Sequence, residues 1–149
     1  MPDLEFAFET HVDVGPPIAI GETAHGLRRI VPILGGTFEG PRVRGSVLPG
    51  ADWQVQRPDG VLEIKASYAL RTEDGAFITI VNEGLRHAPD AVMERLNRGE
   101  TVDPAEVYFR TVPRFETATP VYAWLTRSIL VGYGERRPAQ VVIRFWTVL

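Results

Sequence analysis

The amino-acid sequence predicts a mainly β protein, an antiparallel barrel of about eight or nine strands with one short helix near residues 88–98. Apolar and polar residues alternate with a period of two in most segments, as expected for strands with one buried face. Turns rich in Pro and Gly separate these segments at short intervals. Short strands at such spacing fit a sandwich or a barrel, and closing a barrel removes exposed edges. The 149 residues suit a single domain over residues 1–149.

The first two strands are predicted over residues 4–14 and 26–34. In the first, LEFAFETHVDV, strict alternation places Leu4, Phe6 and Phe8 on the same face as two later valines, with the acids and His11 on the other. The second, GLRRIVPIL, leads into GGTFEG, where proline and paired glycines predict an edge, a bulge or a bend.

Two short strands over residues 41–48 and 52–56 are predicted next, joined by Pro49 and Gly50 and followed by the turn RPDG. A longer hairpin follows. Its strands are VLEIKASYAL and AFITIVNEG, and its turn is TEDG.

The only helix is predicted in HAPDAVMERLNRG, residues 87–99. Pro89 lies near its start, Asp90 favours the helix dipole in the first turn, and Gly99 ends the helix. Three more strands are predicted in VYFRTVPRFE, VYAWLTRSILVGYG and AQVVIRFWTVL.

Composition excludes several functional classes. Sixteen Lys and Arg against nineteen Asp and Glu give a net charge of -3, so we expect no nucleic-acid partner. The absence of cysteine excludes disulfides and thiolate chemistry, and the three histidines lack metal-ligand spacing, so we expect no metal and no cofactor. The N-terminus lacks the basic and apolar pattern of a signal peptide and no segment could span a membrane as a helix, which predicts a cytoplasmic protein without membrane contact.

Three groups of residues resemble the uncharacterised protein family 0311, also called domain of unknown function 3237. They are GGTFEGPRVRGSVLPGADWQVQRPDG, SYALRTEDGAFITIVNEGLR, and YFRTVPRFET followed by VYAWLTRSILVGYG, so the resemblance covers nearly the whole chain. It implies a small antiparallel barrel of lipocalin-like or calycin-like shape that forms homo-oligomers, but it implies no reaction. Lys65, Ala66, Ser67 and Tyr68 depart from the acidic–Ala–Arg–Tyr stretch expected in relatives.

Aromatic residues are the candidate ligand-binding groups. A barrel of about eight strands is filled by side chains or holds one small ligand. Aromatic rings offer a ligand a large apolar contact, and their hydroxyl or N–H groups fix its orientation. The alternative for each ring is ordinary core packing. The candidates are Trp53, Tyr68, Tyr108, Tyr122 and Trp124.

Asp52 and Glu116 are the candidate proton-transfer groups, because each adjoins an aromatic residue and an apolar wall would raise its pKa. Each could instead accept hydrogen bonds in a turn or form an ion pair. Alternation places Tyr108, Arg110 and Glu116 on one face of their strand, which is either solvated or lines a polar interior. In the second case Arg110 would stabilise a developing oxyanion.

These residues support the hypothesis of a small-molecule-binding barrel. As an enzyme it would catalyse cofactor-free acid–base chemistry, of isomerase, lyase or hydratase type, on a small carbonyl or aromatic compound. The alternatives are a noncatalytic ligand carrier and a structural oligomer whose barrel is packed solid.

Overall fold

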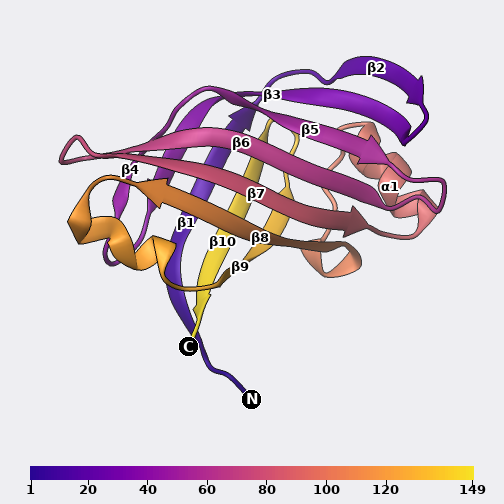
Figure 1. Cartoon of the computed structure of the whole chain (residues 1–149). Helices are drawn as coiled ribbons and strands as arrows, with labels where there is room; N and C mark the ends of the chain where they lie inside the picture. The colour runs from indigo at the N-terminus through magenta and orange to yellow at the C-terminus, as the bar shows by residue number, and fades with distance from the viewer.

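The computed structural model describes residues 1–149 and contains ten strands and three short helices (Figure 1). The strands are β1 (Leu4–Val14), β2 (Ile18–Thr23), β3 (Gly26–Glu39), β4 (Arg44–Val47), β5 (Gly50–Gln56), β6 (Leu62–Thr72), β7 (Phe77–His87), β8 (Tyr108–Thr117), β9 (Leu130–Arg136) and β10 (Gln140–Val148). The helix α1 spans Asp90–Asn97, and the 3₁₀ segments η1 and η2 span Pro104–Glu106 and Pro120–Thr126.

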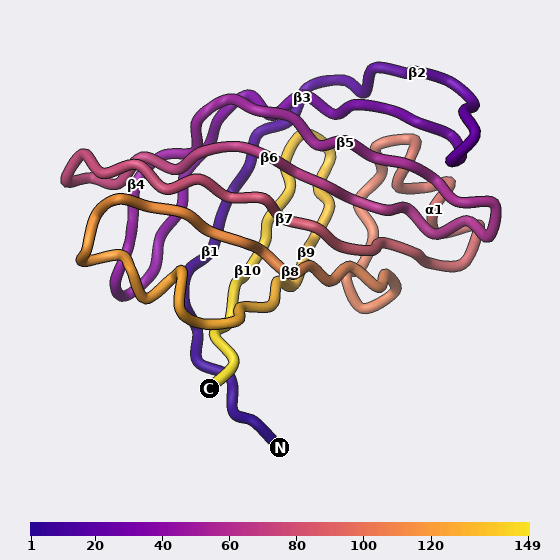
Figure 2. Tube along the Cα trace, viewed as in Figure 1, coloured from indigo at the N-terminus to yellow at the C-terminus, as the bar shows by residue number.

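The strands close into an antiparallel barrel, as predicted. Going round the ring, β1 pairs with β10, then β9, β8, β7 and β6 follow in order. Both β4 and β5 lie between β6 and β3, and β3 pairs back with β1 to close the ring. The remaining strand, β2, pairs only with β3 and extends from the barrel as the tip of a hairpin (Figure 2).

Two segments differ from the sequence prediction. Residues 18–23, for which no strand was predicted, form β2, and the strand expected over residues 121–134 begins only at Leu130. Its first part is η2 instead. Pro120 suits the first turn of a helical segment because it lacks an N–H and has a fixed φ. Tyr122 and Leu125, three residues apart, are both buried, as the three-residue turn of a 3₁₀ segment requires.

A β-bulge in β1 corrects the predicted alternation of that strand. Phe6 pairs with Trp146 and Phe8 with Phe145, so that Ala7 is an extra residue in β1. The extra residue reverses which face of the sheet the side chains before and after it occupy. Phe6 therefore packs edge-on against Trp146, with ring centroids 5.4 Å apart, whereas Phe8 is fully buried.

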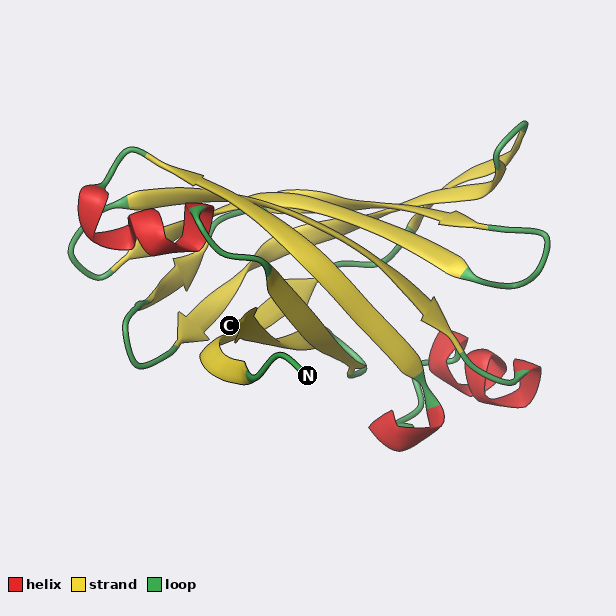
Figure 3. Cartoon of the chain, turned by 60° about the horizontal axis from the view of Figure 1, so that its bottom comes forward, coloured by secondary structure: helices red, strands yellow, loops and turns green.

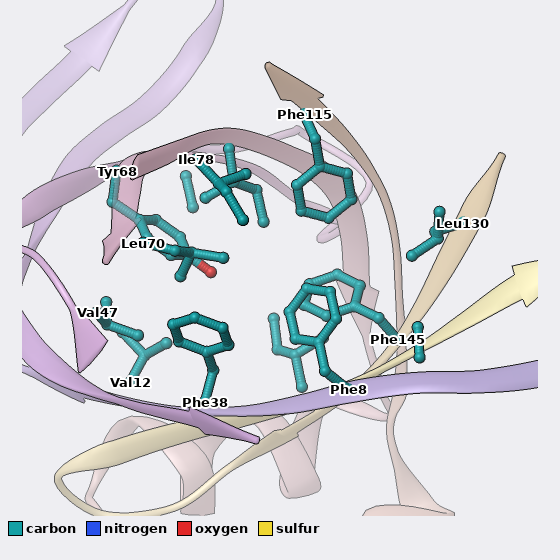
Figure 4. Close-up of a cluster of buried hydrophobic side chains, with 14 of the residues drawn as sticks. Phe8, Val12, Phe38, Val47, Tyr68, Leu70, Ile78, Phe115, Leu130 and Phe145 are labelled. Carbon is teal, nitrogen blue, oxygen red and sulfur yellow. The ribbon is translucent and has the colours of Figure 1, made fainter. Parts of the chain in front are cut away.

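Aromatic and aliphatic side chains fill one end of the barrel (Figure 4). The ring of Phe8 lies 5.9 Å from the rings of Phe38 and Phe115 and 4.9 Å from the ring of Phe145. The segment η2 adds Leu125 to this core, whereas α1 and η1 lie at the other end of the barrel (Figures 1 and 3). None of the helices has the length and apolar content needed to cross a lipid bilayer.

We expect Phe8→Ala to lower the free energy of unfolding by about 3–5 kcal/mol, because it leaves a cavity where four phenylalanine rings meet. Urea denaturation measures the loss. The matched control is Phe77→Ala, since the Phe77 side chain is 57% exposed and its loss costs little. Equal effects of the two substitutions would contradict this description of the core.

Candidate functional site

A cavity of about 320 Å³ occupies the end of the barrel that carries α1. Apolar side chains form one part of its lining, among them Val31, Ile33 and Ile143. Leu96 and Asn97 of α1 and the following Arg98 also line it. The barrel is therefore not packed solid: its aromatic core ends at a cavity large enough for a small ligand.

Strand register assembles the polar wall of this cavity from three strands. Asp52 on β5 pairs with Ala66 on β6, and Ala66 pairs with Asn82 on β7. All three side chains line the cavity. Because the side chain between them is only a methyl group, Asp52 and Asn82 border the same open space.

Asp52 is held by two hydrogen bonds. The amide Nε2 of Gln54 donates to Oδ2 at 2.7 Å, and the backbone N–H of Lys65 donates to Oδ1 at 3.1 Å. Gln54 is itself oriented by Arg29, whose Nε donates to Gln54 Oε1 at 2.6 Å. Burial raises the pKa of Asp52, although these hydrogen bonds and the charges of Arg86 and Arg29 oppose the rise. Asp52 is thus a largely buried carboxyl group that holds its proton more tightly than an exposed aspartate does.

Three neighbouring side chains bear buried polar atoms without a hydrogen-bond partner: Tyr68 Oη, both amide atoms of Asn82, and Arg86 Nε. Asn82 is 1% exposed and Arg86 is 3% exposed. Unpaired buried polar groups are costly, and these side chains have unused hydrogen-bonding capacity on the cavity wall.

The protonation states of Tyr68 and Arg86 suit hydrogen-bond donation. Burial raises the pKa of Tyr68, and the charge of Asp52 raises it further. The Thr10 hydroxyl, which donates to the carbonyl of Ile143 at 3.3 Å, opposes this rise. Burial lowers the pKa of Arg86 to about 10, so both groups keep their protons at neutral pH.

Of the residues predicted from the sequence, only Asp52 and Tyr68 line the cavity. Trp53, next to Asp52 on the same strand, is 47% exposed on the outer face. Tyr108, Arg110 and Glu116 also face outward, because the alternate residues of β8 point into the barrel. The expectation that these four residues line the interior is therefore wrong.

Tyr122 and Trp124 lie on η2, at the opposite end of the barrel from the cavity. The hydroxyl of Tyr122 donates to Asp74 Oδ1 at 2.9 Å. The ring of Trp124 lies 4.3 Å below the guanidinium of Arg42. These two aromatics therefore close the packed end and do not share a site with Asp52.

Most residues of the polar cavity wall were not predicted from the sequence, although the alternation of inward and outward residues in the strands could have indicated some of them. Asn82 and Arg86 continue the inward face of Ile78 and Ile80, where a polar or charged residue needs an explanation. Arg29 likewise precedes Val31 on the inward face of β3. The residues missed were Arg29, Gln54, Asn82, Arg86 and Arg136.

Together these features define a closed antiparallel β-barrel with a polar-walled internal cavity. The family model described as protein of unknown function (DUF3237) matches residues 2–148, and the chain belongs to this family. A UPF0311 protein of Rhodopseudomonas palustris is 44% identical over 148 residues, 99% of this chain and 97% of the relative.

Solved structures share the fold. The crystal structure of a protein of unknown function from Rhodopseudomonas palustris superposes with a TM-score of 0.95 at 42% identity, covering 100% of this chain and 98% of the other. A β-barrel-like protein of Acinetobacter baumannii gives 0.87 at 38% identity, with 100% and 97% covered. A more distant relative is a hydroalkoxylation enzyme of Penicillium herquei, 29% identical over 79 residues, 53% of each chain.

We expect the carboxyl of Asp52 to titrate above its ordinary value of 3.8. ¹³C NMR of the side-chain carboxyls across a pH series measures this. Asp59 is the internal control, because the Arg57 guanidinium beside it lowers its pKa to about 2. A midpoint for Asp52 at or below 3.8 would contradict the proposed environment.

The raised pKa of Asp52 also makes the free energy of unfolding depend on pH. Because the folded state holds the Asp52 proton more tightly than the unfolded state, this group's contribution to stability is greatest below pH 3.8 and falls as pH rises through the folded pKa. The free energy of unfolding of Asp52→Asn, relative to the wild type, is therefore expected to increase with pH in this range. Urea denaturation at several pH values measures the difference.

Proposed function

We propose that the protein binds a small molecule in the internal cavity and that Asp52 transfers a proton to and from it without a cofactor. The observation that carries this proposal is a carboxyl with a raised pKa on the same cavity wall as the unpartnered groups of Tyr68, Asn82 and Arg86. An acid–base residue beside free hydrogen-bond donors is the arrangement that proton transfer at a polarised carbon requires.

The distant fungal relative favours the lyase or hydratase type over the isomerase type. Hydroalkoxylation adds an O–H group across a carbon–carbon double bond, and hydration is the same addition with water as the O–H compound. The relative is named for that activity. We therefore propose an addition of O–H to a double bond conjugated to a carbonyl group.

In this reaction the Asp52 carboxylate takes the proton of the attacking hydroxyl, and the oxygen forms a bond to the β carbon. The π electrons move to the carbonyl oxygen, which becomes an enolate. Protonated Asp52 then gives its proton to the α carbon and returns to the carboxylate. One C–O bond and one C–H bond form, one O–H bond and one π bond are broken, and no oxidant or cofactor is needed. A raised pKa brings the acid and base forms of Asp52 closer to balance at neutral pH.

Arg110 cannot stabilise this enolate, because it lies on the outer face of the barrel between the rings of Tyr108 and Tyr133. Other hydrogen-bond donors must do so. In the cavity, the hydroxyl of Tyr68 and the guanidinium of Arg86 are free to donate. Fixed donors in a site shielded from water stabilise developing negative charge strongly.

Two alternatives make different use of the same fold. A noncatalytic carrier would bind the ligand in the cavity and release it unchanged. A homo-oligomer could form through the outer groove that contains Leu85, Tyr108 and Tyr133, since exposed aromatic and apolar side chains favour subunit contacts. Size-exclusion chromatography with light scattering measures the oligomeric state. The cytoplasmic location stays a prediction, which cell fractionation would test.

We expect Asp52→Asn to lower turnover by at least about 10²-fold while the ligand still binds. A suitable probe is benzylideneacetone, an aryl ketone with a conjugated double bond that loses its near-ultraviolet absorbance when water adds across that bond. Glu116→Gln is the matched control, because Glu116 lies on the outer face. Wild-type turnover in Asp52→Asn would contradict the proposed role, and binding of the probe without turnover by the wild type would favour the carrier.

A further inference from the structure

Three arginines line the cavity without an ion-pair partner: Arg29, Arg86 and Arg136. A fourth, Arg98, is paired with Glu100 at 2.6 Å. The only carboxyl on the cavity wall is Asp52, and it accepts its hydrogen bonds from uncharged groups. Up to three guanidinium charges therefore face one carboxylate in a shared, partly enclosed space.

Arg86 is the most deeply placed of the three. Arg86 is 3% exposed, its side chain forms no hydrogen bond, and its guanidinium carbon lies 5.7 Å from the centre of the Phe109 ring. Arg29 is engaged with Gln54, and Nη1 of Arg136 donates to the backbone carbonyls of Arg137 and Gln140. Arg86 thus keeps its hydrogen-bond donors free for a ligand.

The cluster is electrostatically unfavourable when the cavity is empty. Burial and the charges of Arg29 and Arg136 lower the pKa of Arg86, and Asp52 opposes this only in part. The pKa values of Arg29 and Arg136 are also lowered by burial. Buried charges normally have partners, because leaving them unpaired is costly. A ligand with negative charge would remove that cost.

We infer that the cavity selects an amphipathic carboxylate, with the carboxylate bound by Arg86 and the hydrophobic part against the apolar wall. This inference rests on the ligand binding proposed above and names the class of ligand. The planar fork of a guanidinium matches the two oxygens of a carboxylate. Val31, Ile33, Ile64 and Ile143 provide the apolar contact for an aromatic or alkenyl group.

A bound carboxylate also affects Asp52. A second negative charge in the same cavity raises the pKa of Asp52 further, which favours its protonated form. The higher pKa also makes the Asp52 carboxylate a stronger base towards the attacking hydroxyl, which is the first role of Asp52 in the proposed addition. A conjugated carboxylate such as cinnamate combines the required charge, double bond and apolar ring.

Calorimetric titration of cinnamate and of its neutral isostere cinnamamide into the wild-type protein tests the inference. We expect cinnamate to bind at least about tenfold more tightly, because charge-assisted hydrogen bonds are stronger than neutral ones. Methyl NMR signals of Ile33 and Ile143 should shift on binding, since both residues line the cavity. Equal or weaker binding of cinnamate would overturn the inference but leave ligand binding in the cavity intact. Binding of neither compound would contradict both proposals.

The matched variants are Arg86→Met and Arg110→Met. We expect Arg86→Met to abolish the preference for cinnamate and Arg110→Met to keep it, because Arg110 faces outward between two tyrosines. Without ligand, Arg86→Met should unfold at a temperature no lower than the wild type, because it removes an unpaired buried charge. Retention of the preference in Arg86→Met, or a large loss of thermal stability, would contradict a ligand-binding role for Arg86.

Discussion

Closure of the barrel by β1 is the constraint on which the rest of the structure depends. β1 pairs with β10 along one edge and with β3 along the other, so it joins the two ends of the sheet. Gly36 permits the second pairing, because a side chain there would collide with the backbone of His11. Once the ring is closed its width is fixed, and the volumes of the inward side chains determine which part stays open. Phenylalanines fill one end, whereas Ala66 and the polar residues around it leave the other end hollow.

The hollow end of the barrel buries polar side chains without hydrogen-bond partners, which makes a protein interior less stable. A barrel that served only as a scaffold would bury aliphatic side chains at the positions of Asn82 and Arg86, which make no hydrogen bonds there. Proteins retain such residues at functional sites, where the loss of stability is offset by binding. The raised pKa of Asp52 and the lowered pKa of Arg86 have the same origin, since both groups are withdrawn from water without a close ionic partner.

Local patterning of apolar, polar and turn-forming residues was enough to predict the fold class, most strands and α1, because it depends on neighbouring residues. It could not predict the bulge at Ala7, which requires knowledge of the partner strand, or the 3₁₀ segment that replaces the start of the strand expected at residue 121. The site was harder still. Asp52 and Tyr68 were identified as candidates, but the outward face of β8 carries Tyr108, Arg110 and Glu116, whose chemistry fits a site equally well. Asn82 and Arg86 join Asp52 only through strand register, which residue types do not reveal.

A crystal structure of the protein with cinnamate tests directly whether the hollow end of the barrel binds an amphipathic carboxylate. We expect the phenyl group against Val31 and Ile143, and the carboxylate within hydrogen-bond distance of the Arg86 guanidinium, on the same wall as Asp52. Cinnamate bound only in the outer groove beside Tyr108 and Tyr133, with the internal cavity free of ligand, would contradict this expectation.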